Sequence, residues 1–256
     1  MRTLILCIAV LATAMFAGTG GAHAAELHAL ITTAIKDVVD LLEPRFAHDT
    51  GDTVVVGYGP SGGVARRFLG GEPADLVVID SAAVDGLIKQ GKLMPGRIDL
   101  ASTGIGICVR KGAPHPDVST PEALKRALLA AKTIGHTDPA GGGITAVHIT
   151  KMFERLGIAA EVAPKIRLAA GGPNGRVSVL VSGGEAEIGL QQVSELMSNP
   201  DVEVIGMLPA ELQQITVYSA GIATGAKNAD DAKAFVAALG APSAKPIYKA
   251  GGLDPL

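Results

Sequence analysis

Glycine and hydroxyl side chains gather at four points of the sequence where a helix is expected to begin. A helix N-terminus exposes backbone N–H groups and the positive end of the helix dipole, and glycine lets a ligand come close to the backbone. Junctions of this kind are suited to holding an anion by hydrogen bonds. The four junctions are Thr32 with Thr33, residues 60–63, residues 141–145 and residues 171–175.

Within these junctions, the candidate ligand contacts are hydroxyl groups, glycines and one amide. They are Thr32, Thr33, Ser61, Gly62, Gly143, Thr145 and Asn174. Taken singly, Thr33, Ser61 or Thr145 could simply cap its own helix. The repetition of the pattern favours one shared anion site.

The residue types give little support to other chemistry. No junction carries the lysine of a nucleotide-binding P-loop or the spacing of a dinucleotide fingerprint. His136 and His148 stand apart and Cys108 lies in an apolar run, so a zinc-type ligand set is not indicated. Ser61 follows Pro60 instead of the glycine of a hydrolase nucleophile elbow. We therefore expect no metal and no cofactor.

The elements that must position the junctions alternate between strands and helices. Short apolar, β-branched runs occupy residues 53–56, 76–79, 105–109 and 187–190. Apolar residues at helical spacing lie between them, at Ile35, Val38, Val39, Leu42 and Phe46, and again at Ile149, Met152, Phe153 and Leu156. This alternation predicts an α/β protein with mostly parallel sheets flanked by helices.

The first 24 residues have the pattern of a secretory signal peptide. Arg2 precedes an apolar run at residues 4–17, and residues 22–24 read Ala-His-Ala, which predicts cleavage after Ala24. An uncleaved anchor is the alternative, but the run is shorter than the roughly 20 residues that span a bilayer. We expect a periplasmic protein with no stable membrane insertion after cleavage. Only Cys108 would remain, so no disulfide within the chain is expected.

Composition narrows the ligand and the partners. A mature chain of about 230 residues is long enough for two modest lobes. Loss of Arg2 leaves 21 basic against 25 acidic residues, a formal charge of −4, and nucleic acid is not an expected partner. Aromatic residues make up 3% of the chain and tryptophan is absent. A ligand held by hydrogen bonds is therefore expected instead of one stacked on aromatic rings.

Several segments resemble the molybdate-type solute-binding proteins of bacterial ABC importers. They are Thr32-Thr33-Ala34, residues 61–67 (SGGVARR), residues 70–76 (GGEPADL), residues 138–140 with the following glycines, and residues 182–189 (SGGEAEIG). The segment 70–76 is the most specific, and together the segments extend across essentially the whole mature chain.

The resemblance implies a two-lobed, type II periplasmic-binding-protein fold with the ligand cleft between the lobes. It implies a first lobe of residues 25–103 plus 220–256, a second lobe of residues 104–219, and delivery of a small anion to an ABC permease. The family's hydroxyl contacts fall on Thr32 or Thr33 and on Ser61, and its backbone contacts fall near Thr145 and Asn174. We expect the protein to act as a monomer.

Two departures from this pattern bear on the ligand. The molybdate binders have a tyrosine where this chain has Gln191 and Gln192, and an apolar contact is replaced near Arg176. A guanidinium can hold a carboxylate in a two-pronged arrangement, and an amide can donate to a second carboxyl group. These residues favour an organic polycarboxylate over molybdate or tungstate. The alternative is a solvent-facing Arg176 and amides that bond within their own lobe.

A further alternative is an enzyme on the same fold. The segment with Gln191 and Gln192, together with residues 171–173, is similar to the aconitate isomerase branch of this fold. Interconversion of trans- and cis-aconitate needs a base that takes a proton from one carbon and returns it to another. His136 follows the expected strand at residues 132–134 and is the predicted base, unless it is a surface histidine. The sequence does not separate the isomerase from a transport receptor.

Overall fold

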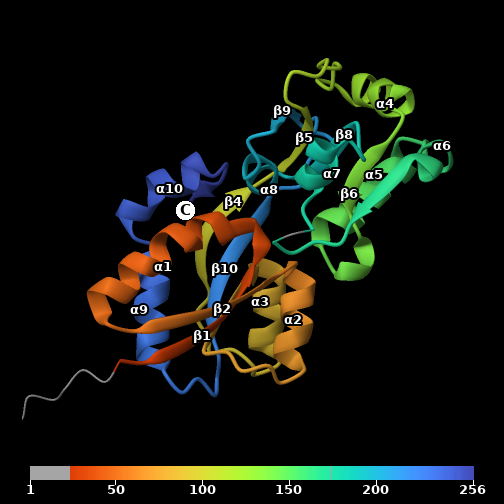
Figure 1. Cartoon of the computed structure of the whole chain (residues 1–256). Coiled ribbons are helices and arrows are strands. Elements are labelled where there is room, and N and C mark those ends of the chain that lie inside the picture. Colours follow the sequence, from red (N-terminus) through yellow and green to blue (C-terminus); the bar gives the residue numbers. More distant parts are fainter. Residues whose placement is uncertain (1–23, 174) are drawn as a thin grey trace, which may run out of the picture.

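Two β-sheets, each with helices on both faces, form the two lobes of the protein (Figure 1). The computed structural model describes residues 24–173 and 175–256. The predicted signal peptide, apart from Ala24, and the candidate Asn174 lie outside the described residues. No helix in the described ranges is long and apolar enough to cross a membrane.

The first sheet has the strand order β11-β4-β10-β3-β1-β2. Its strands are β1 (Glu26–Thr32), β2 (Thr53–Gly59), β3 (Leu76–Asp80), β4 (Ile98–Thr103), β10 (Thr216–Ile222) and β11 (Asp254–Pro255). Its helices are α1 (Lys36–Thr50), preceded by the 3-10 turn η1 (Thr33–Ile35), α2 (Ser61–Leu69), α3 (Ser81–Lys89), α9 (Ala229–Leu239), η4 (Pro242–Ala244) and α10 (Lys245–Ala250).

The second sheet has the order β7-β6-β8-β5-β9. Its strands are β5 (Ile105–Arg110), β6 (Ile134–Thr137), β7 (Ile166–Ala169), β8 (Ile188–Gln192) and β9 (Val202–Met207). Its helical segments are α4 (Pro121–Ala130), η2 (Pro139–Gly141), α5 (Ile144–Arg155), α6 (Ala159–Val162), η3 (Ala163–Lys165), α7 (Val177–Gly183) and α8 (Val193–Met197).

Each sheet is mixed, and the chain crosses between the sheets twice, after β4 and after β9. The strands built from successive βα units, β2-β1-β3 and β7-β6-β8, pair in parallel as predicted. The strands next to the crossings, β4 with β10 and β5 with β8 and β9, pair antiparallel. β10 lies in the first sheet from Thr216 onward, so the predicted lobe boundary at residues 219 and 220 falls inside a strand. The predicted lobe boundaries stay a prediction.

The core consists of one apolar layer on each face of each sheet. Neighbouring residues of a strand point to opposite faces. Ala29 and Ile31 of β1 therefore pack with α1 and α9, whereas Leu30 packs with α2 and α3. The residues predicted as a helical stripe, Ile35, Val38, Val39, Leu42 and Phe46, are all buried in the first of these layers. Cys108 is buried in β5 as predicted, and burial raises its pKa to about 12.

Candidate functional site between the lobes

A small cavity lies between the lobes, where strands of both sheets end and helices begin. It encloses about 30 Å³, room for roughly two or three water molecules. The carboxyl ends of strands are where α/β folds of this kind bind their ligands. Its walls are Thr32, Ala34, Pro60, Ser61, Thr137, Gly143, Ile144, Thr145, Gly171, Gln191, Gln192, Glu195 and Tyr218. The cavity thus brings together six of the predicted residues: Thr32, Ser61, Gly143, Thr145, Gln191 and Gln192.

The first lobe contributes a pair of hydroxyl groups. Ser61 Oγ lies 3.3 Å from Thr32 Oγ1 and accepts the backbone N–H of Asp80 at 3.3 Å. Thr33 is buried beside them but does not line the cavity, and its hydroxyl has no partner among the described residues. Within the described ranges, the N-cap residues of η1, α1, α2 and α5 make no side-chain cap hydrogen bond, and the hydroxyl groups of Ser61 and Thr145 bond to other elements of the protein. The hydroxyls therefore do not serve as caps of their own helices.

In the second lobe, both glutamines at the end of β8 are held by the protein itself. Gln191 Oε1 accepts the backbone N–H of Val177, the first residue of α7, at 2.8 Å. Gln192 Nε2 donates to Thr145 Oγ1 at 2.9 Å and to Thr216 Oγ1 at 3.0 Å. Gln191 is thus bonded within its own lobe, whereas Gln192 also bonds across the cleft to Thr216 of β10 in the first sheet. Gln192 Oε1 is buried without a partner among the described residues.

Arg176 does not line the cavity. Its Nη1 and Nη2 atoms donate to the two carboxylate oxygens of Asp37, at 3.3 and 3.1 Å. Arg176 is 8% exposed and stands just before α7, whereas Asp37 lies in the first turn of α1. The predicted grip on a ligand carboxylate is thus replaced in this structure by an ion pair that joins the two lobes.

The lobes also contact each other between α2 and the glycines that precede α5. Gly62 donates its N–H to the carbonyl of Gly142 at 3.1 Å, and Arg66 Nη2 donates to the carbonyl of Gly141 at 2.9 Å. Gly62 therefore faces the opposite lobe in place of the ligand contact that was predicted. A Cβ atom at Gly62 would lie 2.4 Å from the Gly142 oxygen, so the closed arrangement requires glycine there.

Glu195 and Tyr218 are the ionisable residues of the cavity wall that sequence reasoning missed. Burial raises the pKa of Glu195 to about 7, while attraction to Arg176 and a hydrogen bond with Gln191 act in the opposite direction. Burial, followed by the nearby Glu195 and Asp80 carboxylates, raises the pKa of Tyr218 well above its ordinary value. Tyr218 therefore stays neutral, and Glu195 exchanges a proton near neutral pH. No local pattern marks either residue.

His136, the predicted base, is not part of the cavity wall. It is buried, its Nδ1 atom lies 2.8 Å from the carbonyl oxygen of Thr137, and its ring packs edge-on against Phe153 at 5.9 Å. Burial lowers its pKa. The next residue, Thr137, lines the cavity instead, because alternate residues of β6 face opposite sides of the sheet.

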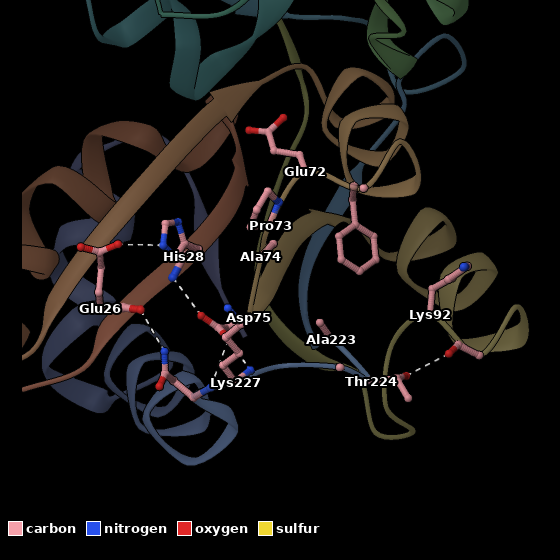
Figure 2. Close-up of a pocket in the computed structure, with 15 residues that line it drawn as sticks. Glu26, His28, Glu72, Pro73, Ala74, Asp75, Lys92, Ala223, Thr224 and Lys227 are labelled. Carbon is pink, nitrogen blue, oxygen red and sulfur yellow. Dashed lines mark hydrogen bonds and ion pairs between the residues drawn. The ribbon is translucent and has the colours of Figure 1, made fainter. Parts of the chain in front are cut away.

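A larger cavity of about 730 Å³ lies at the opposite end of the first sheet (Figure 2). Glu26 and His28, at the start of β1, line it, whereas Thr32 at the other end of the strand faces the interlobe cavity. The buried Asp75 carboxylate there already accepts backbone N–H groups of His28, Lys227 and Asn228. These bonds hold the loop at residues 227 and 228 against the sheet, so the carboxylate of Asp75 has a structural role. The interlobe cavity is therefore the candidate site. Among the described residues, no group of three His, Cys, Asp or Glu side chains is placed to hold a metal ion.

Two lobes built on mixed sheets, with a cleft at the strand ends, define the periplasmic-binding-protein fold of the molybdate-binding type. The solved periplasmic molybdate-binding protein of Azotobacter vinelandii superposes with a TM-score of 0.71 at 21% identity, over 89% of this chain and 98% of that one. The chain belongs to the bacterial extracellular solute-binding protein family, whose family model matches residues 27–254. Membership of an extracellular family implies export.

Two curated proteins are similar over almost the whole chain. An aconitate isomerase from a Pseudomonas species is 30% identical over 237 residues, which cover 90% of this chain and 88% of the isomerase. The molybdate-binding protein ModA of Azotobacter vinelandii is 27% identical over 241 residues, which cover 90% of each chain.

Proposed function

We propose that the interlobe cleft binds a small organic polycarboxylate anion, which the protein carries through the periplasm to an ABC permease. The observation that carries the proposal is the cavity between the lobes, in which hydroxyl and amide groups converge. Export by a signal peptide cleaved after Ala24, a monomeric state, and lobes of residues 25–103 plus 220–256 and 104–219 belong to the same proposal.

Arg176 supports a carboxylate over a metal oxyanion. Asp37 occupies the fork of this guanidinium as a ligand carboxylate would. Exchange of the Asp37 carboxylate for one on the ligand would give Arg176 the binding role expected from the sequence. The released Asp37 would then be hydrated, since its side chain is 44% exposed.

A polycarboxylate needs more room than the cavity has in this structure, so the proposal includes a wider cleft in the bound protein. The contacts that would part are the hydrogen bonds of Gly62 with Gly142 and of Arg66 with Gly141. Each such bond contributes about 1 kcal/mol, which ligand contacts can offset.

A thermal-shift screen of the mature protein tests the ligand class. Citrate, cis-aconitate and trans-aconitate are expected to raise the melting temperature well above the shift given by molybdate, tungstate or sulfate. Saturation at a hundredfold excess over Kd stabilises a folded protein by about 2.7 kcal/mol. Stabilisation by micromolar molybdate or tungstate, with no effect of the carboxylates, would contradict the proposal and favour the molybdate-type alternative.

Aconitate isomerisation is the second candidate function. It is favoured by the 30% identity to an aconitate isomerase and by the Glu195 carboxyl group in the cavity wall. The base would take a proton from the methylene carbon of trans-aconitate, and the electron pair of the broken C–H bond would form the new double bond. The old double bond would accept a proton at its far carbon, which gives the cis isomer without net change. A carboxyl group with a pKa of about 7 suits both transfers.

Incubation of the protein with trans-aconitate tests this candidate. The cis isomer is expected to accumulate without added metal or nucleotide, and Glu195→Gln is expected to lower turnover about 100-fold or more while affinity is kept. His136→Gln serves as the matched control, because His136 lies outside the cavity wall. Tight binding of trans-aconitate without isomerisation would leave a transport receptor.

A further inference from the structure

We propose that the cleft takes up one proton together with its anionic ligand, and that the proton resides on the carboxyl group of Glu195. The inference rests on the proposed function, since it requires that the cleft binds an anion. It concerns how binding by a transport receptor is regulated by pH, since an isomerase would need an ionised Glu195 as its base.

The first step is the charge of the cavity wall. Among its described residues, Glu195 is the one acidic side chain and no lysine or arginine contributes. Helix N-termini and hydroxyl groups supply partial positive charge only. An ionised Glu195 therefore leaves a full negative charge in the wall of a site that must receive an anion.

The second step is that the neighbouring cation is already engaged. Arg176 is paired through both terminal nitrogens with Asp37, so this pair is close to neutral as a unit. The groups that face Glu195 are Arg176 before α7, Asp37 of α1, Gln191 of β8 and Tyr218 of β10. Arg176 and Gln191 favour the carboxylate form, Asp37 disfavours it, and the neutral Tyr218 adds no charge. Burial outweighs these effects and raises the pKa of Glu195 to about 7.

The third step is the effect of the ligand. An anion a few ångströms from a carboxylate in a partly buried site repels it strongly. Such repulsion favours the protonated form of the carboxyl group, which then donates its O–H to a ligand oxygen. A carboxyl group poised near neutrality thus converts from a repelling charge into a hydrogen-bond donor when the anion enters.

The sign of the pH dependence follows from linkage. The complex holds more protons than the free protein above about pH 7, so a rise in pH weakens binding, by a factor that approaches tenfold per pH unit. Below about pH 6, Glu195 is already protonated in the free protein and its contribution to the pH dependence disappears.

Calorimetry of trans-aconitate binding at pH 7.5, in MOPS, HEPES and Tris, measures the proton directly. The observed enthalpy plotted against the ionisation enthalpy of the buffer is expected to give an uptake of between about half and one proton per ligand. Molybdate, which carries no proton in this range, serves as a second probe. Wild-type affinity is expected to fall at least fivefold per unit between pH 7.5 and 9.

Glu195→Gln should abolish the proton uptake and the pH dependence, and should bind at least tenfold more tightly than the wild type at pH 9. Glu211→Gln, at an exposed position away from the cavity, should behave as the wild type. Binding by the wild type without proton uptake, or uptake that persists in Glu195→Gln, would overturn the inference and leave the proposed function intact. If trans-aconitate, citrate and molybdate all fail to bind, the proposed function falls and the inference with it.

Discussion

Burial governs the chemistry of single residues in the cleft. Water would stabilise the charges of Glu195 and Arg176, and both side chains lie largely away from water. They differ in how the protein compensates for the lost hydration. Arg176 keeps its charge because a carboxylate fills its fork, whereas Glu195 gives up part of its charge near neutral pH. Two ionisable groups a short distance apart thus differ in whether they respond to pH.

Replacement of Glu195 by glutamine should change the pH dependence of stability. The folded-state pKa of about 7 lies above the ordinary 4.5, so the folded protein binds more protons than the unfolded chain between these values. Wild-type stability is therefore expected to fall, relative to Glu195→Gln, as pH rises from about 4.5 to 7, by about 1 to 3 kcal/mol in total. Urea denaturation at pH 4.5 and 8 measures the difference. Parallel stability profiles of the two proteins would show that the carboxyl group is hydrated in the folded protein.

Ser61 should contribute to affinity through its hydroxyl group. Ser61→Ala is expected to weaken ligand binding by about 1 to 3 kcal/mol, because a buried anion would lose a hydrogen-bond partner. Ser243→Ala, at an exposed position of η4, is the matched control. Unchanged affinity of Ser61→Ala in calorimetry would remove this residue from the site.

Among the elements, α2 meets the opposite lobe at two of its residues. Its second residue, Gly62, meets the Gly142 carbonyl, and Arg66 one turn later meets the neighbouring Gly141 carbonyl. The helix therefore supplies both the hydroxyl of Ser61 and part of the surface on which the lobes close. The small residue at position 62 is needed because the lobes approach closely there, and not because the helix requires it.

Gly62→Ala should separate closure from folding. A methyl group at this position would collide with the Gly142 oxygen, so the closed arrangement of this structure is expected to be lost. The affinity for trans-aconitate is expected to be kept or raised, because the contact between Gly62 and Gly142 is already parted in the proposed bound form. The free energy of unfolding should be unchanged or higher by about 0.5 to 1 kcal/mol, since alanine favours helix over glycine. Gly86→Ala in α3, with open space around its Cβ position, should show the gain in stability without any change of affinity. A fall in affinity of tenfold or more in Gly62→Ala would mean that the bound lobes lie as close together as in this structure.

At the scale of the whole molecule, two lobes are joined by two chain crossings and by side chains that bridge the cleft. The pair of Asp37 and Arg176 connects residues 139 positions apart in the chain. Loss of this ion pair should affect how the two lobes are held together more than the packing within either lobe. Each partner stands at the start of a helix, and the buried face of that helix would not change.

Asp37→Asn should leave Arg176 without its carboxylate partner. Stability is expected to fall by about 1 to 3 kcal/mol, less than for a fully buried pair because Asp37 is partly exposed. If Arg176 can exchange partners, saturating trans-aconitate should raise the melting temperature more in the variant than in the wild type, whereas molybdate should not. Equal shifts with trans-aconitate in both proteins would show that Arg176 does not reach the ligand.

Local pattern was sufficient for the elements and for most of the cavity wall. The apolar stripe from Ile35 to Phe46 faces the core, and Thr32, Ser61 and Thr145 stand at strand-to-helix junctions that converge. These features depend on the period of a helix or strand and on the residue types that begin a helix, which neighbouring residues determine.

Only the tertiary structure decided which charged groups meet. His136 and Thr137 are adjacent in β6, so their side chains point to opposite faces of the sheet. Thr137 lines the cavity, whereas His136 packs against Phe153. Arg176 pairs with Asp37 and not with a ligand. Glu195 lines the cavity from α8, a helix of five residues that is too short to show a sequence pattern. Pairings of this kind depend on how the two lobes are placed against each other, and the periodicity of a short segment carries no information about a partner more than a hundred residues away.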